Sequence, residues 1–446
     1  MQRRKFFSDL AIQGIGLSAF PFWMTIGQKQ NGSDYGATMS GTPIQKIGNW
    51  TLEEVRDIFK KEFFERNLPI WETGVVDWEY GGYIPKTTPY FDNQGRLVST
   101  YKRLYHQGRC MWLYAYLFNH VEKNDLFLNA ARAGYEFLLK YGYDEKTSLW
   151  HQRISRTGEL IKPFGDIFPC IYMLLALGEY YKATGDEEVA ELGMRSAQAI
   201  SKELTSNHFQ AYGMGPRPQG FDSYREPGTR RLGMWMHFLS ALTPFLRYKP
   251  DPSLEMIAKF CVRNMLSRHY KKDERLAYEF LQHDYTLYPK NYHTHASMRV
   301  VDGFHSVETS WMCMDEALRT ADVAMFTEAL QLGKDVMDML WLERNGRQGL
   351  VRYYWPDEKD PMAKAKILEP YVMNEVWVML LLGMEHSEES WLMEWFDKSF
   401  TYAYKTGKIT FPYGETLHHP RGLLFCIEIL DRIIARKGHR SDFLKA

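Results

Sequence analysis

Cysteine is scarce in this chain of 446 residues, and its five cysteines include no C-x-x-C pair. An odd number of scattered cysteines argues against a disulfide framework, and the missing pairs argue against a structural zinc site. We therefore predict no bound metal. The cysteines lie far apart in the sequence, at Cys110, Cys170, Cys261, Cys313 and Cys426.

An excess of either charge is also absent, because 55 lysines and arginines balance 55 aspartates and glutamates. A protein that binds nucleic acid needs a basic footprint, so no nucleic-acid partner is predicted. The sequence also contains no glycine-rich phosphate-binding loop. We therefore predict no nucleotide and no other cofactor, and the expected partner is a small molecule.

The chain has no uninterrupted apolar run that would make a good membrane span. The mildly apolar stretch Leu10–Ile26 is broken by Gln13 and by glycines. It follows Arg3 and Arg4, and a basic segment before an apolar one is the arrangement of a secretory signal. Adjacent arginines followed by aromatic residues also resemble the twin-arginine export motif.

These features divide the chain into three parts. We predict an export signal over residues 1–30, a polar linker over 31–45 and one catalytic domain over 46–440. The mature protein would then be periplasmic or secreted, without a membrane span. A basic tail on a cytoplasmic protein is the alternative.

Helical periodicity dominates the rest of the sequence. Apolar residues recur at i, i+3 and i+4 in twelve segments that fall into six pairs. This pattern predicts an all-α fold, the (α/α)6 toroidal barrel, with nearly buried inner helices and amphipathic outer helices. The segments are 51–67, 105–121, 126–141, 166–185, 187–204, 231–247, 252–266, 305–320, 322–340, 370–386, 388–404 and 420–436.

Short strand-like pieces lie between the helix pairs, at Gly81–Ile84, Leu149–Ile154 and Leu350–Trp355. In a barrel of this kind we expect such connections to gather at one end and to surround a central cleft. Concave places of this sort are where ligands bind most often.

Two histidine-containing segments stand at helix starts. His305 and Glu308 are three residues apart, so they share a helix face, and a carboxylate there could orient an imidazole and raise its basicity. A capping group with a satisfied histidine is the equal alternative. His418 and His419 precede Pro420, which suits the first turn of the last helix. A polar cap is the plainer interpretation of that pair.

Two further segments place charged residues at or inside apolar helices. Gln107 and Arg109 lie where an inner helix is expected to begin, and a guanidinium there could bind sugar hydroxyls. A salt bridge to a neighbouring helix is the alternative. Glu375 lies in an apolar segment, where an unpaired carboxylate would be costly to bury. It is either hydrogen-bonded structurally or part of a site.

Taken in order, these segments resemble the N-acylglucosamine 2-epimerase family, which includes the renin-binding proteins. The family's opening Gly-Gly-Phe-like strand and its K-x-x-W-x-Q-G-R-x-x-W, G-H-x-x-E-x-x-W and H-V-P-R-x-L motifs all have counterparts here. The matching residues are Gly81, Gly82 and Tyr83; Lys102, Tyr105, Gln107, Gly108, Arg109 and Trp112; His305, Glu308 and Trp311; and His418, Pro420, Arg421 and Leu423.

The resemblance implies a sugar 2-epimerase in which His305 and His418 move the C2 proton through an enediolate. It also implies that Glu308 orients His305 and that Arg109 holds the substrate oxygen on which negative charge develops. A homodimer is a further implication. The other substrate-binding residues implied by the match are Tyr105, Gln107, Trp311, Glu375 and Arg421.

Two departures from the family pattern bear on the substrate. Phe304 replaces the glycine before the first histidine, and Met373 stands where the family often has His or Gln. Because the second position helps to shape the family's sugar pocket, the substrate could differ from N-acetylglucosamine. Aldose–ketose isomerisation and cellobiose 2-epimerisation are alternatives on the same site.

Two alternatives come from other classes of protein. A glycoside hydrolase, for example of the unsaturated glycuronyl type, would need paired carboxylates, and the candidates are Asp166 with Glu308 or Glu375. An inactive protein that binds a sugar or another protein is the other alternative. The two matched histidines favour an enzyme.

Overall fold

The computed structural model describes residues 42–84, 101–209, 227–290, 298–363, 365–368, 373–410 and 417–445. The predicted export signal lies outside the described residues, as does most of the predicted linker. Within the described residues, no helix combines the length and apolar character that crossing a membrane requires.

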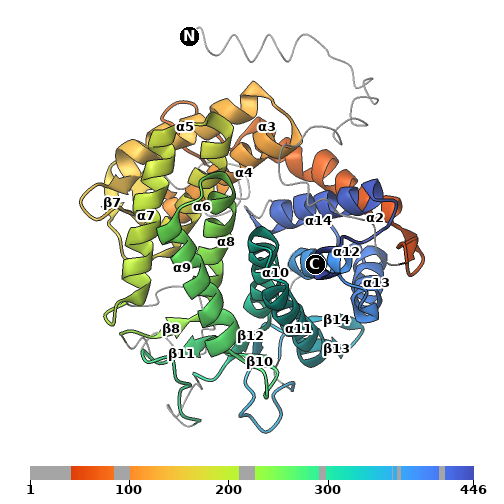
Figure 1. The fold of residues 1–446 in the computed structure, drawn as a ribbon. Helices are drawn as coiled ribbons and strands as arrows, with labels where there is room; N and C mark the ends of the chain where they lie inside the picture. Colours follow the sequence, from red (N-terminus) through yellow and green to blue (C-terminus); the bar gives the residue numbers. More distant parts are fainter. Residues whose placement is uncertain are drawn as a thin grey trace, which may run out of the picture. The chain divides into compact units, whose positions relative to one another are not determined.

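Six almost completely buried helices follow one another around the centre of the fold (Figure 1). Each packs against the next, and an outer helix covers each of them. The inner helices are α4 (Leu104–Tyr116), α6 (Phe168–Thr184), α8 (Leu232–Tyr248), α10 (Gly303–Thr320), α12 (Met373–His386) and α14 (His418–Ala435). The outer helices are α5 (Asp125–Gly142), α7 (Glu187–Thr205), α9 (Pro252–Arg263), α11 (Val323–Leu340), α13 (Ser390–Lys405) and α2 (Leu52–Lys61).

The first and last helices of the described chain close the ring. The outer partner of α14 is α2, so the sixth pair joins segments from opposite ends of the sequence. On the inner side, the Phe425 ring of α14 packs edge-on against Trp112 of α4, with ring centroids 6.4 Å apart. The prediction of an (α/α)6 barrel with twelve main helices is therefore confirmed for the described residues.

Some of the predicted helices change character along their length. The segments Glu62–Asn67, Leu117–Val121 and Asn264–His269 are π-helical extensions of α2, α4 and α9. A short helix, α3 (Leu68–Thr73), continues the first of these, and a 3-10 turn covers Phe443–Lys445. Apolar periodicity does not distinguish these wider turns from α-helix, so they were predicted as continuous helices.

Short strands occupy mainly the connections that lead from an outer helix to the next inner helix. One sheet has three strands, β3 (Tyr101–Arg103), β6 (Arg153–Ser155) and β7 (Leu160–Lys162), in the order β3-β6-β7. The antiparallel pairs are β1 (Lys46–Ile47) with β2 (Trp50–Thr51), β4 (Tyr143–Asp144) with β5 (Leu149–Trp150), β8 (Arg230–Arg231) with β11 (Phe280–Leu281), β9 (Tyr270–Lys271) with β10 (Leu276–Ala277), β12 (Val301–Asp302) with β15 (Tyr353–Tyr354), and β13 (Trp341–Arg344) with β14 (Arg347–Leu350).

One of the three strand predictions was wrong. The segment Gly81–Ile84 contains only an isolated bridge, in which Tyr83 faces Val76. Gly81 and Gly82 have φ angles of 93° and 69°, a left-handed backbone that makes a turn rather than a strand. The other two segments do contain strands, namely β5 with β6 and β14 with β15.

Side-chain oxygens cap most of the outer helices. An oxygen of Asn124, Asp186, Asp251 or Asp322 accepts a backbone N–H at the start of α5, α7, α9 or α11. Among the inner helices, Asp302 caps α10 in the same way, and Asp166 accepts the N–H of Phe168 at the start of α6. These two carboxylates therefore lie at the positive ends of inner helices, where a negative charge is stabilised.

Candidate active site

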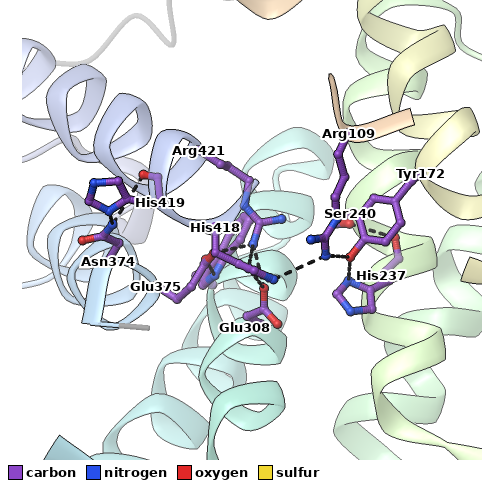
Figure 2. A network of polar contacts seen from close by, with 11 residues as sticks. Arg109, Tyr172, His237, Ser240, Glu308, Asn374, Glu375, His418, His419 and Arg421 are labelled. Carbon is purple, nitrogen blue, oxygen red and sulfur yellow. Dashed lines mark hydrogen bonds and ion pairs between the residues drawn. The ribbon is translucent and has the colours of Figure 1, made fainter. Parts of the chain in front are cut away.

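Polar side chains from all six inner helices meet in one buried network (Figure 2). Each comes from the first two turns of its helix, so the network lies at the N-terminal ends of the ring. The contributors are Arg109 on α4, Tyr172 on α6, His237 on α8, His305 and Glu308 on α10, Glu375 on α12, and His418 and Arg421 on α14.

His418 is held through one ring nitrogen by two carboxylates. Its Nδ1 lies 3.1 Å from Glu375 Oε1 and 3.5 Å from Glu308 Oε1. A carboxylate at Nδ1 keeps a proton on that nitrogen and leaves Nε2 as the basic one. Nε2 in turn lies 3.5 Å from Arg109 Nη2. The arrangement gives His418 the tautomer that a general base needs.

Arg421 binds the two carboxylates that hold His418. Its Nη2 donates to Glu308 Oε1 at 2.6 Å and also to Glu375 Oε1. Burial alone would raise the pKa of Glu308, but its hydrogen bond to His418 and the charges of His418 and Arg421 hold it well below its usual range. Burial opposes the charge of Arg421, yet the two carboxylates raise its pKa. Glu308 is therefore ionised at neutral pH.

His305 is oriented in the same way by different residues. Its Nδ1 lies 2.9 Å from Glu279 Oε2 and 3.6 Å from Asp302 Oδ2. Glu279 is fully buried and accepts a hydrogen bond from Arg231 Nε at 2.5 Å. Burial alone would lower the pKa of His305, but Asp302 and Glu279 raise it above the usual value. Each of the two imidazoles thus has its own carboxylates and its own arginine.

A third set of contacts links the two histidines indirectly. Arg109 lies against the faces of Tyr105 and Tyr172, with Cζ 4.1 and 4.4 Å from the ring centroids. Its Nη2 donates to Tyr172 Oη at 2.8 Å, and that oxygen lies 3.5 Å from His237 Nδ1. The rings of His237 and His305 are 6.0 Å apart. Stacking and hydrogen bonding therefore fix the Arg109 guanidinium beside His418, and Tyr172 and His237 connect it to His305.

His237 differs from the other two imidazoles in its protonation. Burial lowers its pKa well below the usual value, and the nearby positive groups, including His305 and Arg109, add to that effect. It is therefore neutral at the pH at which most enzymes work. No role for His237 could be predicted from the sequence.

The hydrogen-bond partners of Glu308 differ from the one that its spacing in the sequence predicts. We expected it to orient His305, three residues earlier on the same helix, but its carboxylate binds Arg421 and faces His418. The physical reason is that His305 turns Nδ1 toward Glu279, outside the inner helices. Glu308 and His305 share a helix face and lie in the same network, but each binds a different partner.

Several residues predicted to touch the sugar also bind other parts of the protein. Gln107 uses both ends of its amide on the backbone of Tyr83, at 2.8 Å each, and so holds the Gly81–Tyr83 turn. Trp311 donates through Nε1 to Glu375 Oε2 at 3.1 Å. Together with the Arg421 contacts, these bonds hold Gln107, Trp311, Glu375 and Arg421 in place, and their predicted contact with the sugar stays a prediction.

His419, the neighbour of His418, turns toward Asn374 (Figure 2). Its Nδ1 lies 2.8 Å from Asn374 Nδ2, and its Nε2 lies 3.4 Å from Glu62 Oε1. Its contacts therefore join α14 to α12 and to the first π-helical turn. The histidine pair that lies in the network is His305 with His418.

The residues that orient His305 could not be predicted from the sequence. Glu279 and Arg231 come from the connections around β8 to β11, and no motif marks them. Asp302 carried a usable signal, because an aspartate directly before a helix is a strong N-cap, and its side chain does accept from Phe304 N and His305 N. Tyr172 lies in an apolar helical segment, and such a pattern predicts only packing in the core.

Groups of side chains with metal-ligating atoms do occur in the network. The atoms of His237, His305 and Glu308 lie within 4.8 Å of one another, and two other groups are built on Glu279 and on Glu375. In each group an arginine already binds a carboxylate. We therefore assign no metal to them, and the predicted absence of a metal stays a prediction.

The model of the family N-acylglucosamine 2-epimerase (GlcNAc 2-epimerase) matches residues 82–408. The match includes His305 and Glu375 and ends before His418. The cellobiose 2-epimerase of Dictyoglomus turgidum is 24% identical over 283 residues, which cover 59% of this chain and 67% of that protein. The N-acylglucosamine 2-epimerase of Mus musculus is 23% identical over 424 residues, covering 86% and 94%.

Solved structures share the fold at low sequence identity. The cellobiose 2-epimerase from Bacillus thermoamylovorans has a TM-score of 0.69 at 15% identity, over 85% of this chain and 100% of that one. A D-mannose isomerase has a TM-score of 0.66 at 14% identity, over 83% and 97%. Because the family model matches most of the chain, including one of the two histidine segments, this protein belongs to the N-acylglucosamine 2-epimerase family.

Proposed function

We propose that this protein is a carbohydrate 2-epimerase that inverts C2 of a reducing sugar by proton transfer between His305 and His418. One observation carries the proposal. The two imidazoles come from different inner helices, and each has Nδ1 bound to a buried carboxylate. Nε2 is then the nitrogen that exchanges a proton with substrate. Inversion at a planar carbon needs an acid and a base on opposite faces.

The reaction starts when the pyranose opens to its aldehyde. One imidazole Nε2 takes the C2 proton, and the electrons of the C2–H bond form the C1–C2 double bond of an enediolate. The other imidazole delivers its proton to the opposite face of C2, and the aldehyde re-forms at C1. Imidazole suits both steps because its ordinary pKa of about 6.5 lies near the working pH.

Negative charge develops on the C1 oxygen, and the site is built to stabilise it. The Arg109 guanidinium is fixed by two aromatic rings and by Tyr172, so it needs no rearrangement when the charge appears. The N-termini of the inner helices add positive potential at the same end of the ring. We assign Arg109 to the enediolate oxygen on these grounds.

A glycoside hydrolase fits this geometry less well. Hydrolysis needs a carboxylic acid whose pKa is raised so that it can protonate the leaving oxygen. Glu308 has its pKa lowered, and both Glu308 and Glu375 bind Arg421. Asp166 accepts from the backbone N–H of Phe168 at the start of α6. These carboxylates are better suited to orienting other groups.

Deuterium exchange tests the proposed function. The purified protein is incubated in D2O with N-acetylglucosamine, N-acetylmannosamine, glucose, mannose, fructose and cellobiose, and proton NMR follows C2. We expect exchange and epimer formation with at least one aldose. The sugar that reacts identifies the 2-substituent of the substrate and tells whether the substrate is a mono- or a disaccharide. Met373 bears on this choice, because it is the first residue of α12 and precedes Asn374 and Glu375.

The product separates the remaining alternatives. A 2-epimer confirms the proposal, whereas a ketose would make the protein an aldose–ketose isomerase that returns the proton to C1. If no sugar exchanges deuterium and the protein cleaves an unsaturated uronyl disaccharide, the proposed epimerase is wrong and the protein is a glycoside hydrolase. His305→Ala and His418→Ala serve as controls, since each should abolish epimer formation.

Export and oligomeric state are separate proposals. We propose export on the strength of Arg3 and Arg4 before the Leu10–Ile26 stretch. Processing of the chain in a bacterial host with a twin-arginine pathway, and its loss in an Arg3→Lys/Arg4→Lys variant, would support it. A homodimer is proposed from the family resemblance alone, and light scattering of the purified protein tests it.

A further inference from the structure

Phe304 adds an aromatic ring to the first turn of α10, directly before His305. The family pattern has glycine at this position, so the ring occupies space where that pattern has no side chain. Phe304 is 4% exposed, and its backbone N–H donates to Asp302 Oδ1 at 3.1 Å. The ring therefore belongs to the same buried helix start that presents His305.

The backbone before Phe304 is pressed against a neighbouring connection. The N–H of Gly303 donates to the carbonyl of Arg352 at 2.9 Å. A Cβ added at Gly303 would lie only 2.2 Å from the carbonyl oxygen of Val351, so this close approach requires glycine. Because the contact fixes where α10 begins, it also fixes the position from which the Phe304 ring extends.

The Phe304 ring contacts both imidazoles of the proposed mechanism. Its centroid is 5.1 Å from that of His418, with an angle of 67° between the planes, and 6.3 Å from that of His305. The Arg352 guanidinium also lies against it, with Cζ 5.5 Å from the centroid, and binds Asp302 Oδ2 at 3.1 Å. The ring therefore reaches from α10 to the start of α14 and is held by the groups around it.

These contacts bring the ring close to the reacting carbon. In the proposed function C2 lies within reach of Nε2 of both imidazoles, so a ring in contact with both borders the space that C2 and its substituent occupy. Protein interiors are close-packed, and space filled by a phenyl ring is not available to a sugar group. An N-acyl group at C2 is larger than a hydroxyl by a planar amide and an alkyl group. The benzyl group that Phe304 adds relative to glycine is larger than that difference.

Met373 changes the neighbouring helix start in the same sense. It is the first residue of α12, which packs against α10, and it is 6% exposed. A thioether has no hydrogen to donate and is a weak acceptor, so it cannot bind an amide as the His or Gln of the family pattern could. The two departures therefore leave less space and fewer hydrogen-bonding groups for an N-acyl substituent.

We propose that Phe304 determines the substrate class, so that the enzyme accepts aldoses with a hydroxyl at C2 and excludes aldoses with an N-acyl group there. This inference rests on the proposed function. It concerns the size of the C2 substituent and leaves the proton transfer unchanged. It applies equally to a free aldose and to the reducing-end aldose of a disaccharide.

Binding of reduced sugars tests the inference without turnover, because an alditol lacks the aldehyde that the reaction needs. Glucitol with N-acetylglucosaminitol, and lactitol with reduced N-acetyllactosamine, are pairs that differ only in the C2 substituent. By calorimetry we expect the parent to bind the hydroxyl member of at least one pair about tenfold or more tightly, and Phe304→Ala to reduce this preference about tenfold. Equal affinities in the parent, no binding of any alditol, or an unchanged preference in folded Phe304→Ala would overturn the inference.

Two further variants separate pocket size from general loosening. Phe304→Leu keeps the test informative if Phe304→Ala does not fold, and it should reduce the preference by a smaller factor. Phe326→Ala is the matched control, since it removes a buried phenyl ring from the outer helix α11, where that ring packs against His386 and Phe443. The control should lower stability and leave the preference unchanged.

Turnover provides the second readout. The parent should show a kcat/KM for 2-hydroxy aldoses about 100-fold or more above that for N-acetylglucosamine and N-acetylmannosamine, and Phe304→Ala should gain activity on the N-acyl sugars. A parent that epimerises N-acetylglucosamine as readily as glucose would overturn this inference and leave the proposed function standing. A preference among the alditols without turnover of any sugar would do the reverse, because the size limit would hold while the proposed function failed.

Discussion

Arg421 on α14 and Glu308 on α10 form a buried ion pair, with Nη2 of the arginine 2.6 Å from Oε1 of the glutamate. The same nitrogen binds Glu375 on α12, so one guanidinium ties three inner helices together. Both carboxylates also face His418 Nδ1. The ion pair that stabilises this side of the ring therefore also sets the orientation of a catalytic imidazole.

Replacing Arg421 with methionine should be strongly destabilising. The substitution leaves Glu308 and Glu375 buried without their cation, and breaking such a pair typically costs about 3–5 kcal/mol of unfolding free energy. Denaturant unfolding of Arg421→Met measures the loss. Adding Glu308→Gln removes one of the two stranded charges and should recover part of it. A single variant as stable as the parent protein would show that the ion pair contributes nothing.

The two histidines should fail in different ways when each is replaced with asparagine. Either variant should lose epimer formation by at least about 100-fold, because inversion needs both faces of C2. The remaining imidazole can still remove and return a proton on its own face. Each variant should therefore exchange deuterium into only one of the two epimers, and the two variants should favour opposite epimers. Exchange into both epimers by one variant would contradict the two-base mechanism.

Tyr172 should affect catalysis through Arg109 rather than through stability. Tyr172→Phe keeps the ring on which the guanidinium lies and removes the hydroxyl that accepts from Nη2 at 2.8 Å. We expect kcat/KM to fall about tenfold, the loss of one positioning hydrogen bond. Arg109→Lys should be worse, about 100-fold, because a point charge cannot stack between two rings. Thermal unfolding of both proteins is the control.

Much of the fold could be predicted from apolar periodicity. The expected helix 322–340 is observed as Val323–Leu340, because an apolar face and the N-cap Asp322 both mark it. The expected helix 370–386 is observed over Met373–His386, and residues 369–372 lie outside the described part. Pairing of α14 with α2 could not be read from the pattern, since it joins the two ends of the domain.

The site was predictable where chemistry lies on the helices themselves. His305, Arg109 and His418 were chosen from helix starts and from a family resemblance, and the structure brings them into one network through Tyr172 and His237. The partner of His305 was not predictable, because Glu279 is 26 residues away in a connection without a motif. Helix spacing says which residues share a face, and it does not say toward which neighbour a ring nitrogen turns.

The buried ion pairs at the other end of the inner helices should make stability depend on acid pH. Glu385 near the end of α12 binds Arg432 at 2.6 Å and Arg436 at 2.7 Å. Burial alone would raise the pKa of Glu385, but these arginines lower it from 4.5 to about 2. A carboxyl whose pKa is lowered on folding stabilises the folded state above its unfolded pKa, and this contribution is lost as the pH falls through the folded pKa.

Glu385→Gln should therefore lower the unfolding free energy by about 3 kcal/mol near neutral pH, since each pKa unit corresponds to about 1.4 kcal/mol. The difference between variant and parent should shrink below about pH 4.5 and be nearly gone near pH 2. Urea unfolding over this range, at fixed ionic strength, measures it. A difference that stays constant down to pH 2 would mean that Glu385 acts through packing and hydrogen bonds and that its charge contributes nothing.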